Sequence, residues 1–71
     1  MTIEFDSSLG VLYLRIRPGE VADTLEYAED IYVDVDEEGR VLGAEFLHAD
    51  RFFALLAEHQ GVLNIPDVLS A

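Results

Sequence analysis

The acidic residues in the middle of the chain have the spacing of a calcium-binding loop. Asp34, Asp36, Glu38, Gly39 and Glu45 stand at positions 1, 3, 5, 6 and 12 of that pattern. Such a loop wraps its oxygen ligands around the ion between two helices. Here apolar and polar residues alternate on both sides of the loop, as they do in strands. A hairpin of two strands would spread Asp34 and Glu45 along a sheet and would not wrap them around an ion. We therefore expect no tight metal site, and only weak surface binding of divalent cations by Asp34, Asp36, Glu38 and Glu45.

Other residue combinations that could support catalysis are poor. The chain has no cysteine, which excludes a disulfide and a thiolate zinc site. Ser7, Ser8 and Ser70 lie in a turn or tail without a nucleophile elbow, and no glycine-rich phosphate loop is present. His48 and His59 are separated by a predicted helix, so we expect no shared metal site. The sequence favours a protein without cofactor or enzymatic activity, and a small metal-dependent hydrolase stays an alternative.

Tyrosine and arginine side chains gather on one face of the predicted sheet. Tyr13, Arg15 and Arg17 alternate along one predicted strand, and Tyr32 lies on another. Cross-strand pairing is the simpler interpretation. The alternative is a face that binds a protein, because tyrosine and arginine are common in the energetic centres of interfaces.

The amino-acid composition limits the classes of molecule that the chain can bind. Fifteen acidic and four basic residues among 71 give a formal net charge of -11. This charge argues against nucleic acids and anionic membranes and favours a basic protein partner. No targeting signal and no apolar run of about 18 residues, the length of a membrane span, is visible, so we expect a cytoplasmic protein.

Hydrophobic periodicity predicts an α+β fold in a single domain, residues 1–71. Alternation of apolar and polar residues predicts an antiparallel meander of about four strands within a sheet region of residues 1–48. The strands are expected over 2–6, 11–17, 31–36 and 41–47, with a possible short edge strand over 23–27 and Gly39 in a left-handed hairpin position. The expected inner face comprises Ile3, Phe5, Leu12, Leu14, Ile16, Ile31, Val33, Val35, Leu42, Ala44 and Phe46.

The period changes to that of a helix over residues 50–60, which should pack on the apolar face of the sheet. Asp50 is the expected N-cap and Gly61 the expected stop, followed by an apolar tail over 61–71. Hydrophobic residues make up 51% of the chain, more than so short a domain can hide. We therefore expect a homodimer with contacts at Phe52, Phe53, Leu56, Leu63, Ile65 and Leu69. A ligand-binding groove between sheet and helix is the remaining alternative.

Several segments resemble the YuzE-like family of small prokaryotic proteins. They are Ile3-Glu4-Phe5-Asp6, Leu12-Tyr13-Leu14-Arg15-Ile16, and the hairpin from Asp34 to Leu47 with its Asp-x-Asp-x-x-Gly-x-Val-x-Gly-x-Glu pattern. Gly10 and His48 depart from that pattern, because acidic residues are common at both positions. The resemblance implies a compact sheet domain without known activity and, by analogy, an antitoxin-like partner of a small basic toxin. Without that analogy, the sequence predicts a self-associating protein-interaction module.

Overall fold

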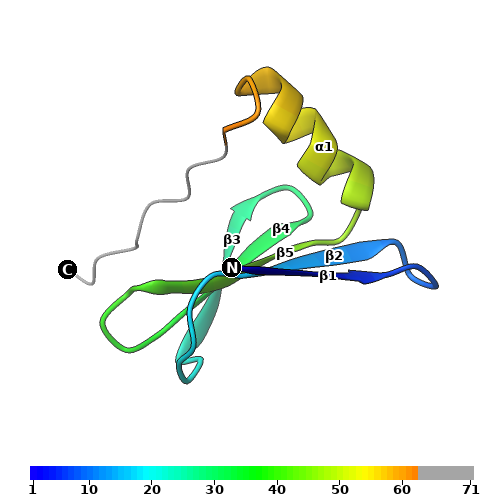
Figure 1. The fold of residues 1–71 in the computed structure, drawn as a ribbon. Helices are drawn as coiled ribbons and strands as arrows, with labels where there is room; N and C mark the ends of the chain where they lie inside the picture. Colours follow the sequence, from blue (N-terminus) through cyan, green and yellow to red (C-terminus); the bar gives the residue numbers. More distant parts are fainter. Residues whose placement is uncertain (63–71) are drawn as a thin grey trace.

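The computed structural model describes residues 1–62 as a five-stranded antiparallel sheet and one helix (Figure 1). This confirms the predicted α+β fold, with five strands instead of about four. Leu63, Ile65 and Leu69, which we predicted as dimer contacts, lie outside the described residues, as does most of the predicted tail. The elements are β1 (Thr2–Asp6), β2 (Val11–Arg15), β3 (Asp23–Ala28), β4 (Ile31–Val35), β5 (Val41–Phe46) and α1 (Ala49–Glu58).

The strand order is β1-β2-β5-β4-β3, which departs from a simple meander at one place. β3, β4 and β5 follow one another through hairpins, but β2 pairs with β5, and the connection after β2 leads to the far edge of the sheet. The distribution of apolar residues among the strands explains this strand order. Leu12 and Leu14 of β2 lie opposite Phe46 and Ala44 of β5, so the most apolar strands pair centrally, whereas the largely exposed β3 forms an edge.

The helix covers the apolar face of the sheet mainly over β2 and β5. Phe52 of α1 meets Phe46 of β5 edge to face, with ring centroids 5.3 Å apart, and the two side chains are 8% and 1% exposed. Two residues expected on the inner face, Ile3 and Phe5, are instead 55% and 58% exposed. They do point to the side of Leu14 and Leu12, but β1 is the edge strand beyond β2, outside the two strands that the helix mainly covers. The core cluster consists of Leu12, Leu14, Ile31, Val33, Val35, Val41, Ala44, Phe46 and Phe52.

An irregularity at Leu42 changes which residue of β5 enters the core. The register with β4 shifts, so that Val41 lies opposite Val35 and is buried in the core cluster. Leu42 is also buried, but against the connection after β2, where a Cβ added to Gly19 would lie 2.7 Å from Leu42 Cδ2. The expected placement of Leu42 on the inner face is therefore corrected, because a bulge interrupts strict alternation.

The helix begins one residue before its predicted start. The N-cap is His48, whose side chain makes no cap hydrogen bond, and Asp50 lies in the first helical turn, where a carboxylate favours the helix dipole. The backbone N–H of Ala49 donates to the carbonyl oxygen of Gly10 at 2.9 Å, which attaches the helix start to the β1–β2 turn. At the other end the left-handed backbone begins at Gln60, with φ 57°, one residue before the predicted stop at Gly61. Gly61 follows with φ 84°, and its N–H donates to Leu56 O at 2.6 Å, which closes the helix end. No helix among the described residues is long and apolar enough to cross a membrane.

Candidate functional site

The face of the sheet opposite the helix carries two ordered rows of polar side chains. Strand alternation turns these residues away from the core, and cross-strand pairing aligns them. The first row runs Glu4, Tyr13, Glu45, Tyr32 and Glu26 from β1 to β3; the second runs Thr2, Arg15, Gly43, Asp34 and Thr24. We call these ten residues the polar sheet face.

A hydrogen-bonded group lies at the centre of the polar sheet face. The hydroxyl of Tyr13 on β2 donates to Asp34 Oδ2 on β4 at 2.7 Å, and the hydroxyl of Thr24 on β3 donates to Asp34 Oδ1 at 2.6 Å. Gly43 on β5 lies beneath this contact, because a Cβ there would overlap the Tyr13 hydroxyl. Both carboxylate oxygens of Asp34 are therefore engaged, and four strands contribute to one contact.

The environment of Tyr13 favours its neutral hydroxyl. Burial, followed by the hydrogen bond to Asp34 and the charge of that carboxylate, raises the pKa of Tyr13 to about 12. Arg15 acts in the opposite direction, and its guanidinium carbon lies 5.3 Å from the centroid of the Tyr13 ring. Arg15 also forms an exposed ion pair with Glu4, with 3.4 Å between Nε and Oε1. Tyr13 is thus held as a neutral hydrogen-bond donor to Asp34.

The other half of the first row is dominated by carboxylates. The Tyr32 hydroxyl donates to Glu26 Oε2 at 3.4 Å, and the charge of Glu26 is the main reason that the pKa of Tyr32 is raised. Glu45 stands between Tyr13 and Tyr32 in the register. This part of the face can therefore accept hydrogen bonds and attract cationic groups.

The four residues of the calcium-like spacing are separated by the fold. Asp34 and Glu45 belong to the polar sheet face, whereas Asp36 and Glu38 lie in the β4–β5 hairpin. Asp36 Oδ1 accepts from the backbone N–H groups of Glu38 at 3.0 Å and Arg40 at 2.9 Å, and Oδ2 accepts from Arg40 Nε at 2.8 Å. Among residues 1–62 no group of three or more acidic or histidine side chains is placed to hold a metal ion.

In the β4–β5 hairpin, Asp36 has a structural role. Desolvation acts to raise the pKa of Asp36, but the backbone and side-chain hydrogen bonds from Arg40 outweigh it and lower the pKa below its usual value. Gly39 has φ 81°, which confirms its predicted left-handed position. Asp36 therefore closes the turn as a structural carboxylate.

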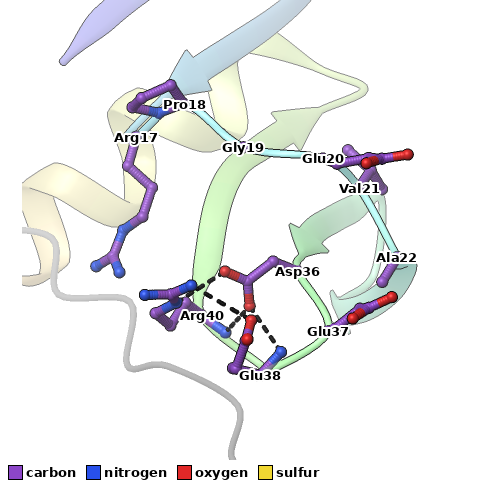
Figure 2. Close-up of a pocket in the computed structure, with 10 residues that line it drawn as sticks. All are labelled: Arg17, Pro18, Gly19, Glu20, Val21, Ala22, Asp36, Glu37, Glu38 and Arg40. Carbon is purple, nitrogen blue, oxygen red and sulfur yellow. Dashed lines mark hydrogen bonds and ion pairs between the residues drawn. The ribbon is translucent and has the colours of Figure 1, made fainter.

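Arg17, which we predicted on the same face as Tyr13 and Arg15, lies elsewhere. The N–H groups of Ile16 and Arg17 both donate to Leu42 O, at 2.8 and 3.1 Å, so the alternation of β2 ends there. Arg17 lines a pocket of about 410 Å³ between the β2–β3 connection and the β4–β5 hairpin (Figure 2). Of the four predicted interaction residues, the structure brings together Tyr13, Arg15 and Tyr32. The pocket is lined by residues 17–22 and by Asp36, Glu37, Glu38 and Arg40.

Exposed apolar residues form a second surface, on the helix side of the sheet. Ile3 and Phe5 of β1 are more than half exposed although they continue the row of the buried Leu14 and Leu12. Of the predicted dimer contacts, Phe53 is 62% exposed. Leu56 is half-buried and packs against the core, and Phe52 is a core residue occupied within its own chain. Ile3 and Phe5 were not predicted as contacts, because their alternation could not show that the helix leaves β1 uncovered.

Sequence reasoning also missed Thr24, Gly43 and Glu26 as members of the polar sheet face. Thr24 and Glu26 lie in a segment of ambiguous periodicity, and Gly43 has no side chain to attract attention. Their roles follow from register, which pairs β3 with β4 and places Gly43 beside both Arg15 and Asp34. The glycine between two apolar residues of a strand was the one available signal of close approach.

No curated protein and no solved structure matches the chain. A family does, over residues 2–49, which span the whole sheet and end where the helix begins. The chain belongs to the family described as protein of unknown function (DUF2283).

Proposed function

We propose that the chain is a non-enzymatic protein-interaction module that associates with itself, most simply as a homodimer. The observation that carries this proposal is the exposure of Ile3 and Phe5, 55% and 58%, on the face of the sheet that otherwise forms the core. An apolar row that ends uncovered is stabilised when another chain removes it from water. Phe53, 62% exposed on α1, is the alternative apolar contact.

Light scattering at micromolar chain concentration tests this proposal directly. We expect a mass of two chains, and a smaller mass on dilution, because association follows mass action. A mass of 7.9 kDa, that of one chain, at the highest concentration reached would contradict self-association.

A second proposal is an antitoxin-like role, in which the polar sheet face binds a small basic protein. The supporting observation is the row of carboxylates Glu4, Glu45 and Glu26 on an open face of a chain with net charge -11. Charge complementarity accelerates and orients such encounters. These carboxylates lie on the face of the sheet opposite Ile3 and Phe5, so this role and self-association are compatible.

An arginine-rich peptide can serve as the probe for the polar sheet face. Glu26→Gln combined with Glu45→Gln should weaken its binding more than Glu37→Gln combined with Glu58→Gln, which removes the same charge from other exposed sites. Equal losses for both pairs would show that only net charge matters and would remove the support for this face.

The other parts of the proposal rest on the sequence. We propose a cytoplasmic location, with which the cysteine-free composition agrees. We keep the YuzE-like resemblance of residues 1–50 as a proposed refinement of the family assignment. A metal-dependent hydrolase has the least support, since Asp34 and Asp36 have hydrogen-bonding partners on different parts of the fold.

A further inference from the structure

The two edges of the sheet differ in how well they are protected from pairing. β3 has an irregular register between Glu26 and Ala28, and it carries acidic side chains without a basic one. β1 pairs with β2 in a regular register over five consecutive residues, and all five residues of β1 are exposed. Bulges and charges are the usual means by which an edge avoids another strand. β1 carries acidic side chains as β3 does, but it has no bulge, and it offers two apolar side chains, Ile3 and Phe5, on one face.

The sequence of β1 is complementary to itself when two copies run antiparallel. With Glu4 on a twofold axis, Ile3 lies opposite Phe5 of the second copy, Phe5 lies opposite the second copy's Ile3, and all five residues of Thr2–Asp6 find partners. A shift by one residue would place Ile3 or Phe5 opposite Glu4, an apolar group against a charge. Shifts by two residues keep the faces matched but leave part of the strand unpaired.

Charges on the polar sheet face are compatible with this arrangement. The two Glu4 side chains would approach each other across the axis, and each is already paired with Arg15 of its own chain at 3.4 Å. The row across the axis would then read Tyr13, Glu4, Glu4, Tyr13, and Arg15 of each chain would reach its own Glu4 from the neighbouring row. Neither β3 nor its neighbour β4 carries an arginine that could offset the acidic side chains of two paired β3 edges.

From this complementarity we propose that β1 is the self-association surface, and that it pairs antiparallel with β1 of a second copy around a twofold axis at Glu4. The result is a continuous ten-stranded sheet in which Ile3 and Phe5 of both copies form one apolar cluster. The isologous contact closes after two chains, as twofold interfaces do. This inference rests on the proposed self-association and specifies its surface and register.

The register can be tested by cysteine cross-linking, because the natural chain has no cysteine. In Glu4→Cys the two sulfur atoms would face each other across the axis, at a Cα separation of about 4.5–5.5 Å, which a disulfide can bridge. Thr2→Cys is the matched control, since Thr2 would lie opposite Asp6 of the second copy and far from its own equivalent. Under mild oxidant we expect a two-chain band for Glu4→Cys and none for Thr2→Cys. Equal cross-linking of both variants, or none with Glu4→Cys, would overturn the register.

A second measurement tests whether β1 is the dimer contact, separately from whether the chain forms a dimer at all. Phe5→Ser should raise the dimer dissociation constant at least about tenfold, because one apolar side chain per copy leaves the interface. Phe53→Ser removes a similarly exposed phenylalanine from the helix. This substitution should change the dimer dissociation constant less than about twofold. Circular dichroism and the melting curve establish that both variants fold.

The outcomes of these measurements are distinct. If the natural chain is a dimer but Phe53→Ser weakens it while Phe5→Ser does not, self-association stands and the β1 surface is wrong. If the natural chain has the mass of a single chain, the proposed function fails, and the β1 pairing fails with it.

Discussion

The hydroxyl of Tyr13 reaches the carboxylate of Asp34 at 2.7 Å across an intervening strand, and it does so over the bare backbone of Gly43. Tyr13 and Asp34 stand on β2 and β4, in adjacent rows of the polar sheet face. Any side chain on β5 at this point would separate them. Gly43 is therefore the residue that allows a hydrogen bond across three strands.

Gly43→Ala should destabilise the fold by about 1–3 kcal/mol, because the new methyl group overlaps the Tyr13 hydroxyl and ring and forces them aside. Urea denaturation measures the change in free energy of unfolding. The same substitution in a Tyr13→Ala background should cost at least about 0.5 kcal/mol less, since the overlap is gone. Equal costs in both backgrounds would show that Tyr13 does not lie over Gly43.

The stability of the protein should fall as the pH rises from about 10 to about 12. The pKa of Tyr13 is raised from 10.0 to about 12 in the folded chain, so folding favours the neutral hydroxyl. Its contribution is fully present below the unfolded pKa and is lost as the pH rises through the folded pKa. Tyr13→Phe should lower stability at pH 7 by about 1 kcal/mol and reduce the alkaline decline. Tyr27→Phe, a change at an exposed tyrosine outside the contact with Asp34, is the control and should retain the alkaline decline.

Phe46→Ala should cost about 3–5 kcal/mol of stability, comparable to the whole stability of a domain of this size. Phe46 is 1% exposed, lies on a central strand and packs against Phe52 of the helix. Phe53→Ala, at 62% exposure, should cost far less when measured under the same conditions. Similar melting temperatures for the two variants would contradict the assignment of Phe46 to the core.

Acid should weaken the β4–β5 hairpin through Asp36. Hydrogen bonds from Arg40, acting against desolvation, lower the pKa of Asp36 from 3.8. Its stabilising contribution is present above the unfolded pKa and is lost as the pH falls through the lower folded pKa. Asp36→Asn should therefore lower the melting temperature at pH 7 and make it less sensitive to pH below about 4. Glu37→Gln, at a neighbouring exposed acid outside the side-chain contacts of Asp36, is the control.

Calcium at millimolar concentration should leave the melting temperature nearly unchanged. Asp34 accepts hydrogen bonds from Tyr13 and Thr24, and Asp36 accepts them from Arg40, so an ion would have to displace existing partners. A specific site would stabilise the folded state by mass action. A rise of several degrees at micromolar calcium would contradict the structural role of these carboxylates.

Local periodicity was sufficient for most of the elements. Leu12, Leu14 and Val33 were assigned to the inner face because alternation in a strand is a local property, and all three are buried. Phe52 was assigned to the inner stripe of a helix for the same kind of reason. The prediction of Asp50 as the N-cap is wrong, because the helix start is attached by a backbone contact from Ala49 to Gly10, far away in the sequence.

The sequence by itself determined four of the five strands, the turns at Gly39 and near Gly61, and a face on which Tyr13, Arg15 and Tyr32 would gather. Only the tertiary structure decided that β2 pairs with β5, and this long-range pairing places Gly43 between Tyr13 and Asp34. It also decided that β1 is an edge which the helix leaves uncovered. The physical reason is that alternation specifies the face toward which a side chain points. Which strand lies beside it depends on how the whole apolar surface is buried.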